Sequence, residues 1–346
     1  MLEKPMEFRH WLNQLLQHQD LSAEQARAWM TATMQGELTS LQIASLLVAL
    51  RSKGESVIEI AEAAKVMRSF ATPVIPESKH LVDTCGTGGD SAGLFNVSTC
   101  VAFVAAAAGA KVAKHGNRSV SSLTGSADVL EALGVEIQLT PEQMARCIDS
   151  LGVGFLFAPL LHPAMKYAVE PRRELGVRTL FNVLGPLTNP AGAQRQVIGV
   201  FDPAWLRPMA EVLRILGSTH ALIVHGNGLD EFTLFGTSQV AELKNGEIEE
   251  YDCEPEDFGI SSHNLDSLRV TSAEESAQLI QKILKGKPGP AADLVALNAG
   301  AAIYVAGCAR TMQQGVDMAQ DALSTGLASE RLKELVELTR LFKATN

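Results

Sequence analysis

The sequence predicts an α/β protein made of a small all-helical domain and a larger α/β domain with a mostly parallel central sheet. Helix start and stop signals recur up to about residue 70, and strand and helix patterns alternate from there to about residue 225. Such alternation is typical of a parallel sheet with helices on its faces. A chain of 346 residues is long enough for two such units. We expect a helical domain over 1–73 and an α/β domain over 74–346.

Capping boxes mark three helix starts in the first domain. In this motif a Ser or Thr pairs with a Glu or Gln three residues later, and each side chain accepts a backbone N–H at the helix start. The pairs are Ser22 with Gln25, Thr39 with Gln42, and Ser56 with Glu59. Gly36 and Gly54 stand where two of these helices should end, and Pro73 with Pro76 breaks the helical pattern.

The second domain shows strand and helix signals in turn. We expect strands at 81–82, 111–113, 153–157, 196–200 and 221–225, helices at 97–108 and from about 126 and 141, a hairpin turned by Asn245-Gly246, and helices to the C-terminus. Residues 253–271 carry the least pattern, which predicts a mobile surface segment.

Two donor-rich runs follow apolar segments early in this domain. The first, Gly86-Thr87-Gly88-Gly89-Asp90, lets the backbone approach a ligand and point N–H groups at an anion. The second, residues 114–122, supplies a Lys, an Arg, an Asn and three Ser as side-chain donors. The helix expected at 97–108 begins just after the first run, so its positive end should face the same anion. A tight turn alone would also need glycine, but the two runs together predict a site for a phosphorylated metabolite.

Motif and charge disfavour several classes of protein. No Gly-Lys-Ser/Thr follows the glycine run as in a P-loop, and Ser91 stands where a dinucleotide fingerprint needs its third glycine. A net charge of −10 disfavours a nucleic-acid surface. The five cysteines show no metal-binding spacing, and the most apolar run, 100–110, is too short to span a bilayer. We expect a cytoplasmic protein without nucleic-acid or membrane partners.

Two further groups of charged residues have more than one interpretation. Asp230-Glu231 follows an expected strand and could hold Mg²⁺, although a solvated acidic turn is the commoner role of such a pair. Arg172-Arg173-Glu174, near His162 and Lys166, could bind a carboxylate or form a salt-bridged helix surface. His115 and His162 have no visible Ser or Cys partner, which disfavours nucleophilic catalysis.

On these residues the chain resembles the anthranilate phosphoribosyltransferases over essentially its full length. The matching segments are 86–90, 96–99, 114–122, 125–130, 172–176, 185–190 and 230–231. The resemblance implies transfer of a phosphoribosyl group from phosphoribosyl pyrophosphate to the amine of anthranilate, a step of tryptophan biosynthesis. It also implies two Mg²⁺ ions per subunit, a homodimer, and the fold shared with pyrimidine nucleoside phosphorylases. In that fold, helices around 163–185 pack back onto the helical domain.

The resemblance assigns roles to residues one position at a time. Phosphoribosyl pyrophosphate would contact Gly86, Gly89, Asp90, Asn96, Val97, Ser98, Thr99, Lys114, His115, Gly116, Asn117, Arg118, Ser119, Ser121, Ser122 and Ser126. Anthranilate would contact Gly86, Asn117, His162 and Arg172, and the metal ligands would be Ser98, Asp230 and Glu231. No catalytic base is assigned, and Lys114 and His115 are the candidates.

Three leucines depart from the family pattern. Leu94 stands where a hydroxyl residue commonly touches the substrate, Leu123 where a polar or basic residue is common, and Leu161 where many members have a His. Two alternatives stay open: a pyrimidine nucleoside phosphorylase of the same fold, and a non-catalytic relative that binds nucleic acid.

Overall fold

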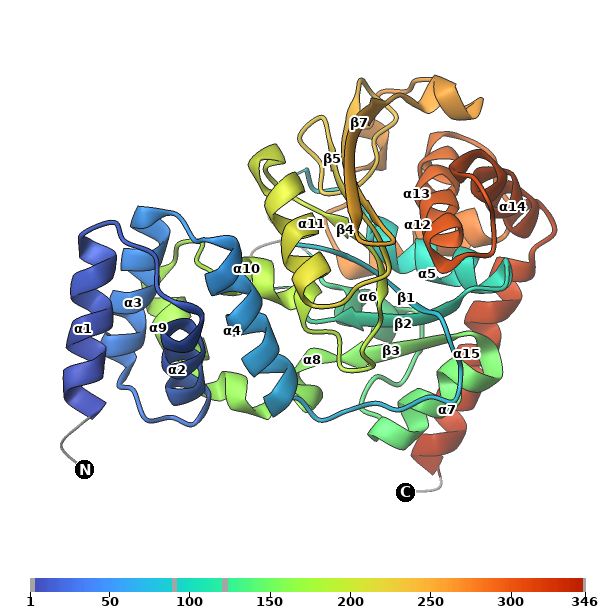
Figure 1. Ribbon diagram of the computed structural model, residues 1–346. Coiled ribbons are helices and arrows are strands. Elements are labelled where there is room, and N and C mark those ends of the chain that lie inside the picture. Colours follow the sequence, from blue (N-terminus) through green and yellow to red (C-terminus); the bar gives the residue numbers. More distant parts are fainter. Residues whose placement is uncertain (1–3, 89–91, 120–123, 345–346) are drawn as a thin grey trace.

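The computed structural model describes residues 4–88, 92–119 and 124–344, and it places a helical bundle beside a seven-stranded sheet that carries helices on both faces (Figure 1). The N-terminal helices of the bundle are α1 (Lys4–Leu16), α2 (Ala23–Met34), α3 (Ser40–Lys53) and α4 (Val57–Phe70). The predicted combination of an all-helical part and an α/β part is confirmed.

The predicted capping boxes form in the bundle. Ser22, Thr39 and Ser56 each accept the backbone N–H three residues on, and the residue at that position accepts the N–H of the cap in return. Gly54 follows α3 with a φ of 91°, and Gly36 follows α2 with a φ of 72°; a side chain would be strained at either position. Local sequence therefore sets where α2, α3 and α4 begin and where two of them end.

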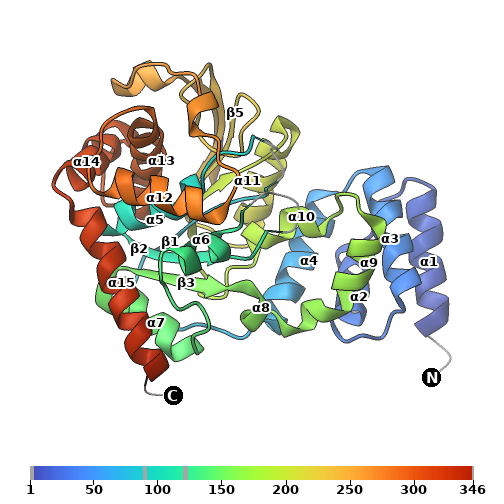
Figure 2. The same ribbon diagram turned by 180° about the vertical axis from the view of Figure 1, so that it is seen from behind.

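A later segment of the chain returns to the bundle. Its helices are α9 (Lys166–Leu175) and α10 (Phe181–Leu184), and the short helix before them, α8 (Ala158–Leu161), contacts β3. α9 contacts α3 and α2, and its Ala168 is fully buried in the apolar cluster of the bundle. Figure 2 shows α9 beside α2 and α3, far from its sequence neighbour β3.

The sheet has the order β3-β2-β1-β4-β5-β6-β7. Its strands are β1 (Leu81–Gly86), β2 (Lys111–Gly116), β3 (Val153–Phe157), β4 (Arg195–Gly199), β5 (His220–Gly226), β6 (Ser238–Lys244) and β7 (Glu247–Cys253). The first five are parallel, and β6 and β7 are antiparallel additions joined by the predicted Asn245-Gly246 turn. The strand order reverses direction between β1 and β4, and ligands bind outside the carboxyl ends of strands at such a point.

Helices cover both faces of the sheet. They are α5 (Val97–Ala107), α6 (Ser126–Ala132), α7 (Pro141–Leu151), α11 (Leu206–Ile215), α12 (Ala273–Leu284), α13 (Pro290–Ala306), α14 (Met312–Ser324) and α15 (Leu327–Ala344). Alternate residues of β5 face opposite sides: Ile223 joins the cluster with α11 and the bundle, and Leu222 joins the cluster with α5 and α13. Figure 1 shows α11 on one side of the strands and α5 and α13 on the other.

Two expected segments differ in the structure. The strand expected at 111–113 continues to Gly116, because Lys114, His115 and Gly116 pair with Phe155, Leu156 and Phe157 of β3. The segment 253–271, expected at the surface, contains two 3-10 helices, at Pro255–Phe258 and Asp266–Leu268, and buries the side chains of Ile260, Leu268 and Val270. It lacks a periodic pattern because it follows the surface of the α/β part rather than one face of a helix or strand.

Candidate active site

Three glycines make room for the acidic pair at the carboxyl edge of the sheet. Gly86 ends β1, Gly199 ends β4 opposite it, and Gly226 ends β5. A Cβ on Gly86 would collide with the Asp230 carboxylate, one on Gly199 with the Asp230 carbonyl oxygen, and one on Gly226 with the Glu231 carbonyl oxygen. Asp230-Glu231 therefore lies across the ends of β1, β4 and β5, at the point where strand order reverses.

Hydrogen bonds fix the acidic segment in place. The N–H of Gly88 donates to Asp230 Oδ2 at 2.8 Å. The neighbouring Phe232 donates to Asn298 Oδ1 at 2.9 Å and accepts from Asn298 Nδ2 at 3.0 Å, and Asn298 is buried on α13. Both acidic residues are half-buried. The solvated-turn interpretation therefore does not fit this arrangement.

Lys114 joins the first two strands to α5 inside the site. Its buried Nζ donates to the Thr84 carbonyl oxygen at 2.6 Å and to Ser98 Oγ at 3.2 Å. Burial lowers the pKa of Lys114, and the nearby charges of Asp83 and Glu231 oppose that shift. Lys114, Ser98 and the acidic pair thus share one polar region at the carboxyl edge of the sheet.

A buried aspartate that the sequence interpretation missed holds the ends of β1 and β2 in register. Asp83 Oδ1 accepts the His115 N–H at 3.1 Å, and Oδ2 accepts Asn189 Nδ2 at 2.8 Å. Asn189 Nδ2 also donates to the Ala113 carbonyl oxygen at 2.8 Å. Burial raises the pKa of Asp83, and the Lys114 charge opposes that shift. No local pattern identifies Asp83, because its partner Asn189 is distant in sequence.

The N-terminus of α5 opens onto the same region. Asn96 is the N-cap, but its side chain makes no capping hydrogen bond. In the first turn, the N–H of Ser98 has no acceptor among the described residues, and the positive end of the helix favours an anion there. The side chains of Val97 and Thr99 are buried, and their N–H groups donate to the Phe95 and Asn96 carbonyl oxygens at 2.7 and 3.2 Å, so their contacts with the ligand stay predictions.

The loop after β2 is braced by an aspartate. Asp128 on α6 accepts from Ser119 N at 3.2 Å and from Gly125 N at 3.0 Å. Arg118 pairs with Asp128 at 2.9 Å, and its other terminal nitrogen donates to Glu131 at 2.8 Å; these partners raise the pKa of Arg118. The Arg118 guanidinium is thus engaged by two carboxylates, and its contact with the ligand stays a prediction.

The remaining predicted phosphate-site residues fall into two groups. Asn117 Oδ1 accepts from Arg118 N at 2.7 Å, and a Cβ on Gly116 would lie 3.2 Å from Ser126 Cβ, so these residues gather at the start of α6. Four predicted contacts lie outside the described residues: Gly89, Asp90, Ser121 and Ser122.

Two buried histidines lie side by side near the end of β2. The ring centroids of His115 and His162 are 5.1 Å apart. Burial lowers the pKa of His115 to about 3 and that of His162 to about 4, so both rings are neutral near pH 7. Each ring bonds a backbone carbonyl, of Gly185 or Thr188, and within the described part of the chain neither Nε2 has a partner. Each Nε2 lone pair is available to accept a hydrogen bond.

Arg172 lies on α9, half-buried over an aromatic ring. Its guanidinium carbon is 5.3 Å from the centroid of the Phe181 ring. Burial lowers its pKa, and no ion pair joins Arg172 to a described carboxylate. The next residue, Arg173, is exposed. A half-buried guanidinium without an acidic partner can receive the carboxylate of a ligand.

Two of the three unusual leucines have structural roles. Leu161 is buried in the apolar cluster, and its carbonyl oxygen accepts from Thr72 N at 2.8 Å. Leu94 packs against the same cluster and pairs with Arg269. Leu123 lies outside the described residues.

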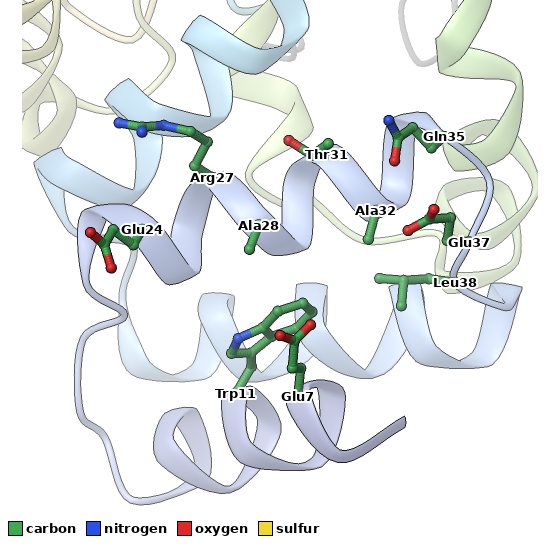
Figure 3. A pocket seen from close by; sticks show the side chains of 10 residues that line it. All are labelled: Glu7, Trp11, Glu24, Arg27, Ala28, Thr31, Ala32, Gln35, Glu37 and Leu38. Carbon is green, nitrogen blue, oxygen red and sulfur yellow. The ribbon is translucent and has the colours of Figure 1, made fainter. Parts of the chain in front are cut away.

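A separate pocket of about 360 Å³ lies on the bundle between α1 and α2. Figure 3 shows Trp11 and Glu7 rising from α1 toward α2. The pocket lining includes Glu24, Arg27 and Leu38, and none of its lining residues is a predicted site residue. The predicted site residues therefore lie apart from this pocket.

Known proteins resemble this chain over nearly its whole length. The chain matches the model of the glycosyl transferase family helical bundle domain at residues 9–71 and that of the a/b domain at 78–329. It is 55% identical to the anthranilate phosphoribosyltransferase of Ectopseudomonas mendocina (strain ymp), and the match covers 99% of both chains. The chain belongs to the anthranilate phosphoribosyltransferase family. The resemblance seen in the sequence is thus confirmed.

Solved structures of the family share the fold over nearly the whole chain. The anthranilate phosphoribosyltransferase of Thermus thermophilus superposes with a TM-score of 0.91 at 47% identity, covering 95% of this chain and 99% of that one. The anthranilate phosphoribosyltransferase of Saccharomyces cerevisiae, in complex with phosphoribosyl pyrophosphate (PRPP) and Mg, gives a TM-score of 0.87 at 25% identity. This match covers 96% of this chain and 98% of that one. The fold of the family therefore extends through both the bundle and the α/β part.

Two kinds of feature are absent from the described residues. They contain no group of three or more His, Cys, Asp or Glu side chains that could hold a metal ion. None of the described helices is both long and apolar enough to cross a membrane.

Proposed function

We propose that this chain transfers the phosphoribosyl group of phosphoribosyl pyrophosphate (PRPP) to the amine of anthranilate, giving N-(5-phosphoribosyl)anthranilate and pyrophosphate in tryptophan biosynthesis. The chain is thus a pentosyltransferase, a kind of glycosyltransferase. The observation that carries this conclusion is the position of Asp230-Glu231 beside Lys114, Ser98 and the N-terminus of α5. Carboxylates for a metal and donors for phosphate meet there at one edge of the sheet.

The residues of the chain orient the reactants and neutralise charge. Displacement at the anomeric carbon leaves negative charge on the departing pyrophosphate, which Lys114 and the positive N-terminal end of α5 can stabilise. The anthranilate amine is a neutral nucleophile near pH 7, so no strong base is required. His115, with a pKa of about 3, is a weak base, but its Nε2 can accept an amine hydrogen and orient the nucleophile.

We propose that Ser98, Asp230 and Glu231 hold two Mg²⁺ ions together with the pyrophosphate of PRPP. The donor set fits, because two carboxylates and a hydroxyl leave positions open for waters and phosphate oxygens. The S. cerevisiae family member bound to PRPP and Mg supports use of the metal. Bound Mg²⁺ supplies Lewis-acid stabilisation of the leaving group. The other PRPP contacts proposed are Gly86, Gly89, Asp90, Asn96, Val97, Thr99, Lys114, His115, Gly116, Asn117, Arg118, Ser119, Ser121, Ser122 and Ser126.

We propose that anthranilate binds among Gly86, Asn117, His162 and Arg172, with its carboxylate on Arg172. Replacing Arg172 by Ala should raise the KM for anthranilate. A lost charged hydrogen bond is worth about 1.5–3 kcal/mol, or roughly 10- to 150-fold in KM. Steady-state kinetics at saturating PRPP measures this effect. The matched control is Arg173→Ala on the same helix, because Arg173 is exposed and should leave KM unchanged. An unchanged KM in Arg172→Ala would remove Arg172 from the site.

Product analysis separates this activity from its alternatives. Anthranilate-dependent release of pyrophosphate from PRPP is expected, whereas phosphorolysis of uridine with inorganic phosphate is not. The comparisons do not favour the nucleoside phosphorylase, since a 55% identical relative covering 99% of the chain is an anthranilate phosphoribosyltransferase. The net charge of −10 likewise disfavours a nucleic-acid-binding relative. Uridine phosphorolysis without pyrophosphate release would overturn the proposal.

We propose that the chain forms a homodimer through the outer face of the bundle. Leu41 and Val48 lie seven residues apart on one face of α3 and are 77% and 47% exposed. Leu16 on α1 and Val169 on α9 are also exposed, and α3 contacts both helices. Figure 1 places α1 and α3 at the end of the bundle away from the sheet. Exposed apolar side chains on adjoining helices are typical of an interface.

Introducing charge on this face should separate the dimer. The variant Leu41→Glu with Val48→Glu is expected to halve the mass measured by light scattering, because carboxylates would be buried without partners. Leu327→Glu, at a 52% exposed leucine of α15, is the control and should stay dimeric. A monomeric wild-type chain, or a dimeric double variant, would contradict this interface.

We also propose a cytoplasmic location and two structural units. All five cysteines are free thiols, which supports a reducing compartment. The proposed units are 1–73 together with the helices around 163–185, and the rest of the chain. Hydrogen bonds between the segments that connect these units support this division. Thr72 N donates to the Leu161 carbonyl at 2.8 Å, and Val74 N donates to the Pro190 carbonyl at 3.1 Å.

A further inference from the structure

One half-buried side chain, that of Asn96, joins the ends of the connections that follow β1 and β2. Asn96 ends the connection from β1 to α5, and Thr124 lies near the end of the connection from β2 to α6. Thr124 Oγ1 donates to Asn96 Oδ1 at 2.8 Å, and Asn96 Nδ2 donates to the Thr124 carbonyl oxygen at 3.3 Å. The two loops are therefore tied to each other at Asn96.

A serine from a distant helix completes the network. Ser276, fully buried in the first turn of α12, donates from Oγ to Asn96 Oδ1 at 2.9 Å and accepts the Asn96 backbone N–H at 3.0 Å. The Asn96 N–H fixes the direction of the hydroxyl, because that oxygen must accept from the backbone and donate to the amide. Ser276 therefore holds both the backbone and the side chain of the same residue.

The network sets the orientation of the Asn96 amide. Both acceptor positions of Oδ1 are filled by hydroxyls, from Thr124 and Ser276. A flipped amide would place its oxygen against the Thr124 carbonyl and its NH₂ against a hydroxyl that already accepts a hydrogen bond. In the observed orientation, one of the two Nδ2 hydrogens has no acceptor among the described residues. The network leaves Asn96 as a pure donor toward a ligand.

The segment before α12 supports the same loop. Val270 N donates to the Gly93 carbonyl at 2.9 Å, and Phe95 N donates to the Leu268 carbonyl at 3.2 Å. Arg269 also donates to the Ala92 carbonyl at 2.6 Å. Residues 268–270 therefore pair with residues 92–95, and Ser276 contacts the next residue of the loop, Asn96.

We propose that Ser276 is a positioning residue for PRPP, acting through Asn96 and with Thr124. It holds the ends of both loops on α12 and presents the remaining Asn96 N–H to an oxygen of the ligand. This inference rests on the proposed function, because it requires PRPP to bind at these loops.

The test compares two Ser→Ala substitutions on one helix. Ser276→Ala removes both hydrogen bonds to Asn96. Ser272→Ala removes only the N-cap of α12, where the Ser272 Oγ accepts Glu275 N at 3.2 Å, and does not affect Asn96. Calorimetric titration with Mg²⁺ and PRPP should show roughly tenfold weaker binding in Ser276→Ala only. In kinetics, the KM for PRPP should rise while the KM for anthranilate stays within about twofold.

A second pair of variants keeps the test decisive if Ser276→Ala does not fold. Thr124→Ser retains the hydroxyl and should bind PRPP as the wild type does. Thr124→Val removes the hydroxyl and should weaken PRPP binding, as Ser276→Ala does. Equal PRPP affinity in wild type, Ser276→Ala and Thr124→Val would overturn this inference alone. Equal losses in Ser276→Ala and Ser272→Ala would reduce Ser276 to a structural role. A wild-type chain that binds no PRPP would overturn the proposed function as well.

Discussion

Turnover should collapse when Asp230 is replaced by Asn and Glu231 by Gln in one variant. The amides keep the size of the side chains but remove both negative charges, so the proposed metal site loses its anionic ligands. Stabilisation of the leaving group by a bound metal is worth several kcal/mol, so we expect a loss of at least roughly 100-fold in kcat/KM. The Mg²⁺ concentration that gives half of the maximal rate should also rise.

The control for this variant is an acidic pair elsewhere in the chain. Glu249 and Glu250 are both exposed on β7, at the edge of the sheet away from β1. Replacing both by Gln changes the net charge by the same amount and should leave the rate and its Mg²⁺ dependence unchanged. If the Asp230/Glu231 variant kept both properties, the proposed metal ligands would be wrong.

Adding a single methyl group at the end of β4, in Gly199→Ala, should also lower Mg²⁺-dependent turnover. In Gly199→Ala the new Cβ would overlap the Asp230 carbonyl oxygen, and that atom belongs to backbone held by Gly88 and Asn298. Overpacking costs about 1–3 kcal/mol, and here relief requires movement of the acidic segment itself. We therefore expect lower stability together with a large loss of Mg²⁺-dependent turnover.

Gly154→Ala separates the loss of stability from the displacement of Asp230. Its Cβ on β3 would lie 2.7 Å from Ile148 Cγ1 of α7, a clash between strand and helix that does not touch the acidic segment. Thermal unfolding and kinetics should show lower stability in both variants but an altered Mg²⁺ dependence only in Gly199→Ala. A Gly199→Ala enzyme with wild-type kinetics would contradict the role given to the three strand-end glycines.

Local sequence is sufficient to predict much of the architecture. The capping boxes at Ser22, Thr39 and Ser56 act within one helical turn, so their residues identify the helix starts directly. The glycine run and the cluster of donors after β1 and β2 are also local, and both are visible in the sequence. The strand predicted to end at residue 113 continues through Lys114 to Gly116. This error also has a local cause, because a polar residue at the buried end of a parallel strand resembles a loop residue.

The arrangement of the site depends on pairings that no local pattern contains. The position of Asp230 follows from a strand order that brings β1 beside β4, so its contact with Gly86 joins distant parts of the chain. The Asp83–Asn189 and Asn96–Ser276 hydrogen bonds span 106 and 180 residues. In the sequence, the spacing of Asp230-Glu231 alone favours a solvated turn. Before the structure is considered, only the resemblance to the family reverses that interpretation.

The most direct test of the account is the loss of anthranilate fluorescence after the purified chain is mixed with PRPP, with and without Mg²⁺. We predict a rapid loss that requires both PRPP and the metal and is accompanied by pyrophosphate release. Unchanged fluorescence from a folded chain supplied with all three components would contradict the proposed transfer and the roles assigned to Lys114, Ser98 and the acidic pair.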